Sequence, residues 1–209
     1  MGFTIHYFYN PNLPPNNANT SADGKTHTAI VELGNISPNQ DWNFIIAHEL
    51  AVIVAANYGL RTSLITLQPQ DSSCANLVEN MRDMMSTPFR DGILASYGLN
   101  VEREFYAHRI PPLFSLACDE GNNTLENLGD ACQYVQLVLY WQIVLHKSDK
   151  PPIIEKWWQD CRPNAWTMGQ DILAMIPTER LITTKDITNI FGGIIENEQY
   201  NLQGCVSLP

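Results

Sequence analysis

The residues that could do chemistry in this 209-residue chain stand together in one apolar segment. Between Phe44 and Ala56 the only polar side chains are those of His48 and Glu49. An imidazole can bind a metal or accept a proton, and an adjacent carboxylate can act as a general base. In a helix, positions i and i+4 lie on one face, so a second metal ligand would stand at position 52. That position is Val52, whose side chain cannot donate to a metal.

The segment that carries this pair has the start and stop signals of a helix. Ser37 is a suitable N-cap, Pro38 occupies N1, and Gln40 at N3 completes a capping box. Gly59 is a suitable residue to follow the last turn. We therefore predict a helix over about 38–58. Because it is apolar on nearly all sides, we expect it to be buried in the middle of its domain.

Two strands are predicted ahead of this helix. Phe3–Tyr9 alternates polar and apolar residues, and Thr26–Leu33 is rich in β-branched residues. The stretch 10–24 between them is rich in Pro and Asn and is predicted as a loop. This order predicts a small N-terminal sheet that covers the helix.

The rest of the chain is predicted to be mostly helical. A helix over Asp71–Met85 is expected to stop at Pro88, and a separate short helix is expected over Phe89–Tyr97. Four more helices are predicted, over 123–146, 153–161, 165–175 with Asn164 as its cap, and 185–191 with Thr183 or Thr184 as its cap and Gly192-Gly193 as its end.

Length and composition fit one folded domain. The chain has 44% hydrophobic and only 16% charged residues, which is typical of a globular protein with a sizeable core. We predict an α+β fold in a single domain over 1–209. The sheet and the apolar helix occupy 1–110, and the helical part occupies 111–209.

The charge balance excludes some classes of partner. Twelve Lys and Arg against 22 Asp and Glu give a net charge of −10, with no clustered basic patch. Phosphate neutralisation supplies most of the affinity for nucleic acids, so no nucleic-acid partner is expected. The same reasoning disfavours a membrane surface, because anionic headgroups repel an acidic protein.

The cysteines predict a reduced protein. They are five in number and far apart, with no Cys-x-x-Cys pair: Cys74, Cys118, Cys132, Cys161 and Cys205. An odd, scattered set is typical of reduced thiols in the cytoplasm. The first six residues, which lack the pattern of a signal peptide, lead to the same expectation.

The block from Phe44 to Val54, followed by Tyr58-Gly59, resembles the active-site helix of the zincin-type metallopeptidases. The family pattern is an apolar stretch, His-Glu-Leu-Ala/Gly-His, two or three apolar residues and a glycine. The resemblance covers about thirty residues, from Ile30 to Gly59. It implies a zincin-like fold.

The resemblance also assigns roles to three positions. His48 matches the first zinc ligand and Glu49 the general base that activates the metal-bound water, while Val52 replaces the second ligand. A catalytic zinc has three protein ligands and a water, and here the second ligand is missing. We therefore expect no bound cofactor, with zinc as the open alternative. We therefore predict a catalytically degenerate metallopeptidase-like protein, in which Glu49 is a vestigial general base and which serves as a scaffold or binds a peptide or protein.

Two alternatives remain open. The first is an active metal-dependent hydrolase with a substituted ligand set, and the second is an interaction module unrelated to the zincins. In the first, His48 would need new partners. The candidates are His27, Glu79, Asp83, Glu102, Glu104 and His108.

The roles of His48 and Glu49 have structural alternatives. His48 is interpreted as a core histidine hydrogen-bonded to a carbonyl or a neighbouring side chain, because lone histidines on apolar faces are usually structural. For Glu49 we expect a salt bridge or hydrogen bond that fixes the helix, since an unpaired buried carboxylate is costly.

Overall fold

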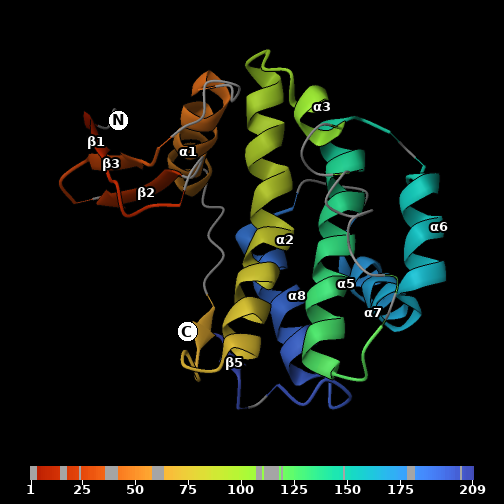
Figure 1. The fold of residues 1–209 in the computed structure, drawn as a ribbon. Coiled ribbons are helices and arrows are strands. Elements are labelled where there is room, and N and C mark those ends of the chain that lie inside the picture. The colour runs from red at the N-terminus through yellow and green to blue at the C-terminus, as the bar shows by residue number, and fades with distance from the viewer. Residues whose placement is uncertain are drawn as a thin grey trace.

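The computed structural model describes most of the chain. The described residues are 4–14, 18–23, 25–35, 42–57, 64–106, 110, 118, 120–147, 149–177, 182–202 and 204–209. The fold is α+β, as predicted, with a small sheet to one side of a larger group of helices (Figure 1). None of the helices within these ranges has the length and hydrophobicity that are needed to span a membrane.

Within the described residues, the sheet has three strands in the order β1-β3-β2. Strand β1 (Thr4–Tyr9) runs parallel to β3 (Thr28–Leu33), and β2 (Ala18–Asp23) runs antiparallel to β3. The loop predicted over 10–24 is therefore wrong for 18–23. The sequence Ala-Asn-Thr-Ser-Ala-Asp has little intrinsic strand preference, and its pairing with β3 decides its conformation.

Helix α1 (Trp42–Asn57) carries the apolar segment. It packs on β2 and β3 on one side and on α2 (Ser72–Ser96) on the other (Figure 1). The predicted burial in the middle of the domain is wrong, because from Asn43 to Ala55 only Ala51, Ile53 and Ala55 are buried. Among the described residues, α1 packs mainly on the sheet and on α2, and the rest of its surface stays partly exposed. Positions 38–41 and 58 of the predicted helix lie outside the described residues.

The centre of the molecule is instead the pair α2 and α5 (Thr124–Leu139), which lie side by side (Figure 1). Helix α2 begins as predicted, because Asp71 accepts hydrogen bonds from the backbone N–H groups of Ser73 and Cys74. Fully buried side chains from both helices fill the core between them: Leu77, Val78, Met81, Met84, Met85, Leu128, Cys132, Val135 and Val138.

Pro88 does not interrupt α2, contrary to the prediction. A proline inside a helix removes one backbone hydrogen bond and costs about 3 kcal/mol. Met84 and Met85 before it and Leu94 after it are all buried. Each buried side chain of this size contributes about 1.5–3 kcal/mol, so together they offset the cost of the proline.

Further helices in the described part of the chain lie around this pair. They are α3 (Val101–Glu104), the π-helical turn η2 (Tyr140–Val144) that continues α5, α6 (Pro152–Cys161), α7 (Pro163–Met175) and α8 (Thr184–Glu196). Thr183, one of the two predicted caps, caps α8, and it does so in a capping box with Asp186. The helix does not end at Gly192-Gly193, because the burial of Ile194 on the core carries it one turn further.

The start of α7 is capped from a distant part of the chain. The carboxylate of Glu120 accepts hydrogen bonds from the backbone N–H groups of Asn164 (3.0 Å) and Ala165 (2.8 Å). Asn164 lies in the first turn and makes no side-chain cap, so the predicted role of this residue is wrong. A carboxylate at a helix N-terminus is favourable for the same reason as a local cap.

Four of the five cysteines form disulfides, so the prediction of reduced thiols is wrong. Cys74 pairs with Cys205, which precedes the short strand β5 (Val206–Ser207). Strand β5 pairs with β4 (Ile65–Thr66) and holds the chain end against the start of α2. Cys118 pairs with Cys161 at the end of α6. These partners are 131 and 43 residues apart in the sequence, so only the tertiary fold brings them together.

Cys132 is the remaining thiol, and it should be protected until the protein unfolds. It is completely buried, and burial raises its pKa to about 12. Because the thiolate is the reactive form, we expect iodoacetamide at about pH 8 to leave the native protein unmodified. Mass spectrometry should find one modified thiol after unfolding without reductant and five after reduction.

A Cys132→Ala variant is the control, because it should show no modification before reduction. Three or more thiols modified in the unfolded, unreduced protein would contradict the disulfide assignment.

The close approach of α5 and α7 depends on a glycine. A Cβ at Gly169 would collide with the ring of Tyr134 and lie 3.4 Å from the carbonyl oxygen of Ala131. We expect Gly169→Ala to lower the free energy of unfolding by about 1–3 kcal/mol, measured by urea denaturation. The control is Gly192→Ala in α8, where the nearest atom is 3.8 Å away. This variant should gain up to about 1 kcal/mol, and equal stability of both would contradict the packing.

Candidate functional site

The strongest candidate site lies between α1 and α2. His48 on α1 and Asp91 on α2 are 43 positions apart, and His48 Nδ1 lies 2.8 Å from Asp91 Oδ1. Only 1% of Asp91 is exposed, whereas 18% of the His48 side chain is. The ring of Phe44, one turn earlier, stacks on the imidazole with a centroid distance of 6.2 Å. The imidazole is therefore held from two directions.

The prediction that His48 is hydrogen-bonded to a neighbouring side chain is confirmed. An ionised carboxylate can only accept, so a neutral His48 must carry its proton on Nδ1 and donate it to Asp91. Nε2 then has a lone pair, and in the described part of the chain it makes no hydrogen bond. A histidine oriented in this way can fasten two helices, accept a proton or bind a metal through Nε2.

The position one turn beyond His48 holds an apolar residue and lies among apolar neighbours. Val52 is half-buried, and its neighbours Ala51 and Ile53 are buried. Among the described residues, no three His, Cys, Asp or Glu side chains are grouped so that they could hold a metal ion.

Glu49 faces a different environment from His48. Its side chain is half-buried, and no hydrogen bond or ion pair joins it to another described residue. The expected salt bridge that would fix α1 is therefore not found there. Partial exposure explains how the carboxylate is tolerated, because it keeps contact with water. Its role as a general base stays a prediction.

The other residues proposed as partners of His48 are spread over several elements. Asp83 on α2 pairs with Arg90, at 3.7 Å. Glu79 on α2 and Glu102 on α3 are exposed. His27 lies in the turn before β3, where its φ is 52°. His108 and the side chain of Glu104 lie outside the described residues.

Asp91 is the site residue that the sequence interpretation missed. The signal was present, because Asp91 stands seven residues after Met84 and three after Pro88, both of which are buried. This spacing places it on the apolar stripe of its helix, where an acidic residue needs a partner. Because the helix was predicted to stop at Pro88, the apolar stripe was not followed as far as Asp91.

A second cluster of polar side chains joins α5, α6 and α7. The carboxylate of Glu155 accepts hydrogen bonds from the Tyr134 hydroxyl and, at 3.1 Å, from Trp166 Nε1. Gln170 donates to the Tyr134 hydroxyl. Burial, and next the adjacent Glu155, raise the pKa of Tyr134, so this phenol stays a donor. Both carboxylate oxygens are engaged, which indicates a structural fastening rather than a reactive group.

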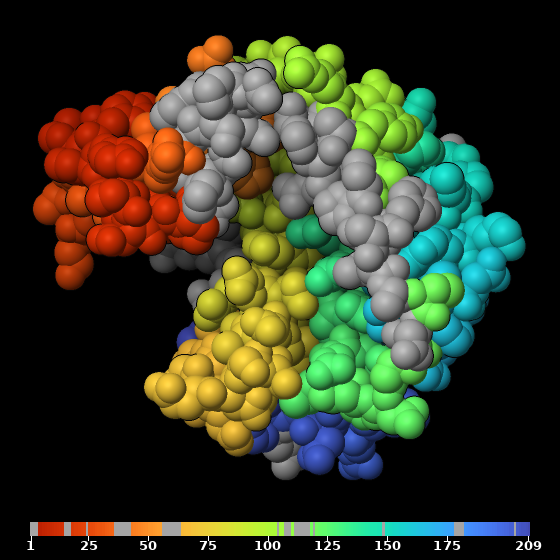
Figure 2. Space-filling view, in the orientation of Figure 1, coloured from red at the N-terminus to blue at the C-terminus, as the bar shows by residue number. Residues whose placement is uncertain are grey.

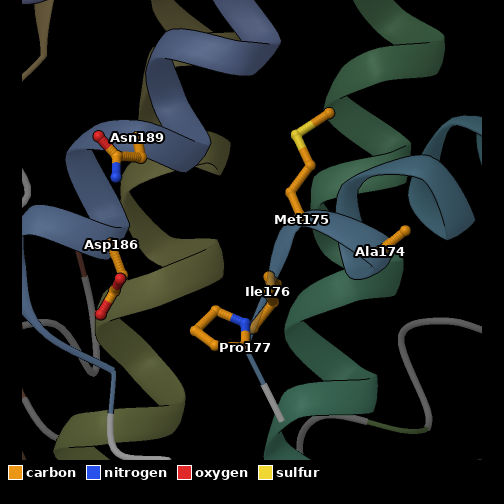
Figure 3. A pocket seen from close by; sticks show the side chains of 6 residues that line it. All are labelled: Ala174, Met175, Ile176, Pro177, Asp186 and Asn189. Atoms are coloured by element: carbon orange, nitrogen blue, oxygen red, sulfur yellow. The ribbon is translucent and has the colours of Figure 1, made fainter.

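A shallow pocket lies between the end of α7 and α8 (Figure 3). Asp186 and Asn189 line it from α8, and the opposite side is formed by 174–177. The cavity holds about 200 Å³, below the usual range for small-molecule sites. Asp186 is already engaged as a cap by the backbone N–H and hydroxyl of Thr183, at 2.8 and 2.7 Å. This pocket is therefore a weaker candidate than the His48–Asp91 pair.

The energetic coupling of His48 and Asp91 can be measured by a double-mutant cycle. We expect His48→Ala and Asp91→Ala each to lower the free energy of unfolding by about 1–3 kcal/mol, because each leaves a polar group without this partner. The double variant should lose less than the sum, with a coupling of about 1 kcal/mol or more. Urea denaturation provides all four values.

The matched control is Glu49→Ala, which changes the adjacent residue. We expect it to alter stability by no more than about 0.5 kcal/mol. Strictly additive effects of the two single substitutions would show that the hydrogen bond contributes nothing to stability.

Comparison with protein-family models, curated proteins and solved structures finds no match to this chain.

Proposed function

We propose that this protein is a non-catalytic binding module, a degenerate relative of the zincin-type metallopeptidases whose partner is a peptide or another protein. The observation that carries the proposal is the His48–Asp91 pair. The histidine that resembles a metal ligand donates from Nδ1 to a buried aspartate on the next helix. In this role it fastens α1 to the helical body, which consists of α2 and the helices that follow it in the sequence.

The surroundings of the pair support a binding role over a hydrolytic one. Peptide hydrolysis of the zincin kind requires a second ligand one turn after His48, and that position is Val52. Helix α1 also keeps much apolar surface partly exposed, with Ile45, Ile46 and Leu50 only half-buried. Surface of this kind is useful for binding another protein.

A metal-dependent hydrolase with a substituted ligand set is the second candidate. One observation favours it: histidine ligands of metals commonly donate their other ring N–H to a carboxylate, as His48 does to Asp91. Nε2 of His48 would then be the ligand, and Glu49 the base. This candidate needs further ligands that are not grouped with His48 in the described part of the chain.

The third possibility, an interaction module unrelated to the zincins, shares the binding role and differs only in ancestry. The sheet that packs along α1 is the arrangement that the resemblance implies, and it is the feature that favours descent from a zincin-like fold.

The cellular compartment is also part of the proposal. The cytoplasm was predicted from thiols that were expected to be reduced. Two disulfides argue for an oxidising compartment, because disulfides persist there and are rare in the cytoplasm. We therefore infer that the protein acts where disulfides are stable.

Metal content and peptide cleavage together test the proposal. We expect the untagged protein, analysed by elemental mass spectrometry, to hold no zinc that depends on His48. Cleavage of a fluorogenic peptide library should be at background with or without added zinc, and Glu49→Gln should change nothing.

The control substitution is His146→Ala, which removes an exposed histidine after η2. Near-stoichiometric zinc that is lost in His48→Ala but kept in His146→Ala, with cleavage that disappears in Glu49→Gln, would overturn the proposal in favour of the hydrolase.

A further inference from the structure

Strand β1 leaves an open edge on the sheet. It pairs with β3 on one side only, and in the described part of the chain no strand pairs with its other side. Its backbone N–H and C=O groups along that side can therefore pair with another strand. The sheet protrudes from the helical body as a separate lobe (Figure 2), so this edge can be approached.

The apolar face of the sheet extends beyond the helix that covers it. The register of β1 with β3 places Tyr7 beside Val31 and Tyr9 beside Leu33, so these side chains share one face. Val31 is completely buried, whereas Tyr7 is 50% and Tyr9 67% exposed. The cause is the position of α1, which in the described part of the chain packs on β2 and β3 rather than on β1.

The two edges of the sheet differ in chemistry. The β2 edge has the polar sequence Ala-Asn-Thr-Ser-Ala-Asp, which ends in a charge. The β1 edge has the sequence Thr-Ile-His-Tyr-Phe-Tyr, without an acidic or permanently charged residue. In a chain of net charge −10, an edge without acidic side chains is where two copies can meet with least repulsion.

We propose that β1 pairs antiparallel with β1 of a second copy, about a two-fold axis perpendicular to the sheet, to give one six-stranded sheet. The sequence of β1 is complementary to itself in the register centred on Tyr7. Tyr7 then faces its counterpart, Ile5 faces Tyr9, and His6 faces Phe8 on the opposite side. Aromatic pairs and pairs of aromatic with β-branched residues stabilise adjacent strands.

This dimer also completes the uncovered face. The two-fold axis places both α1 helices on the same side of the joined sheet. Tyr7 and Tyr9 of the two copies then lie between these helices. A layer of helices over a continuous sheet is a stable architecture for burying such a face.

The buried area suits a dimer of modest affinity. Each aromatic side chain can bury about 150–250 Å², and Tyr7, Phe8 and Tyr9 each expose at least half of theirs. With the strand backbone, the total for the two copies approaches ~1,000 Å², near the lower limit for a specific interface. We therefore expect a dissociation constant in the micromolar range, on the order of 10 µM.

Sedimentation velocity of the full chain tests the dimer. We expect a monomer–dimer equilibrium between about 1 and 100 µM. Tyr7→Lys should weaken it by tenfold or more, because two lysines would face each other at the axis. The matched control is Tyr97→Lys at the end of α2, where the tyrosine is 75% exposed, and it should leave the dimer unchanged.

A second variant keeps the test decisive if Tyr7→Lys disturbs the fold. Tyr7→Cys should form a disulfide between the two introduced thiols of a dimer under mild oxidation, identified by peptide mapping, whereas Tyr97→Cys should not. A wild type that stays monomeric at about 100 µM would overturn the proposal, because that exceeds the expected dissociation constant. A dimer that persists unchanged in Tyr7→Lys would also overturn the proposal. The same holds if the Tyr7→Cys variant dimerises without forming the disulfide. None of these outcomes depends on whether the protein hydrolyses peptides.

Discussion

The burial of α2 between α1 and α5 is the interaction on which the rest of the structure depends. One side of this helix forms the core with α5, and the other side holds α1 and, through it, the sheet. Its first turn carries Cys74, which anchors the C-terminal strand β5 through Cys205. Because one helix serves both halves of the molecule, its packing is strong enough to keep it continuous through Pro88.

The packing of α1 on α2 includes a polar contact between His48 and Asp91. Asp91 is nearly fully buried, and the hydrogen bond from His48 helps to satisfy its carboxylate where α1 packs on α2. The same hydrogen bond fixes the orientation of the imidazole. A residue pair that looks catalytic in the sequence can therefore be explained by the need to join a small lobe to a larger helical body.

The helical body is fastened by long-range polar and covalent contacts as well as by its core. Glu120 caps α7, Cys118 holds the same segment to the end of α6, and Glu155 joins α6 and α7 to Tyr134 on α5. The N-terminal lobe has fewer such fastenings among the described residues. Its tyrosines on β1 and the flanks of α1 keep exposed apolar surface, which is why binding is assigned to this part of the molecule.

The sequence by itself determined the features that depend on neighbouring residues. The α+β class, β1 and β3, the start of α2, a threonine cap on α8 and the apolar character of α1 all follow from local patterns of hydrophobicity and hydrogen bonding. The tertiary structure decided the remaining features, because these features depend on contacts between residues that are distant in the sequence. It made β2 a strand through pairing with β3, kept α2 intact through Pro88, and brought the disulfide partners together. For the candidate site, the sequence supplied His48 and its neighbour Glu49, but only the packing of α1 on α2 placed Asp91 against the imidazole.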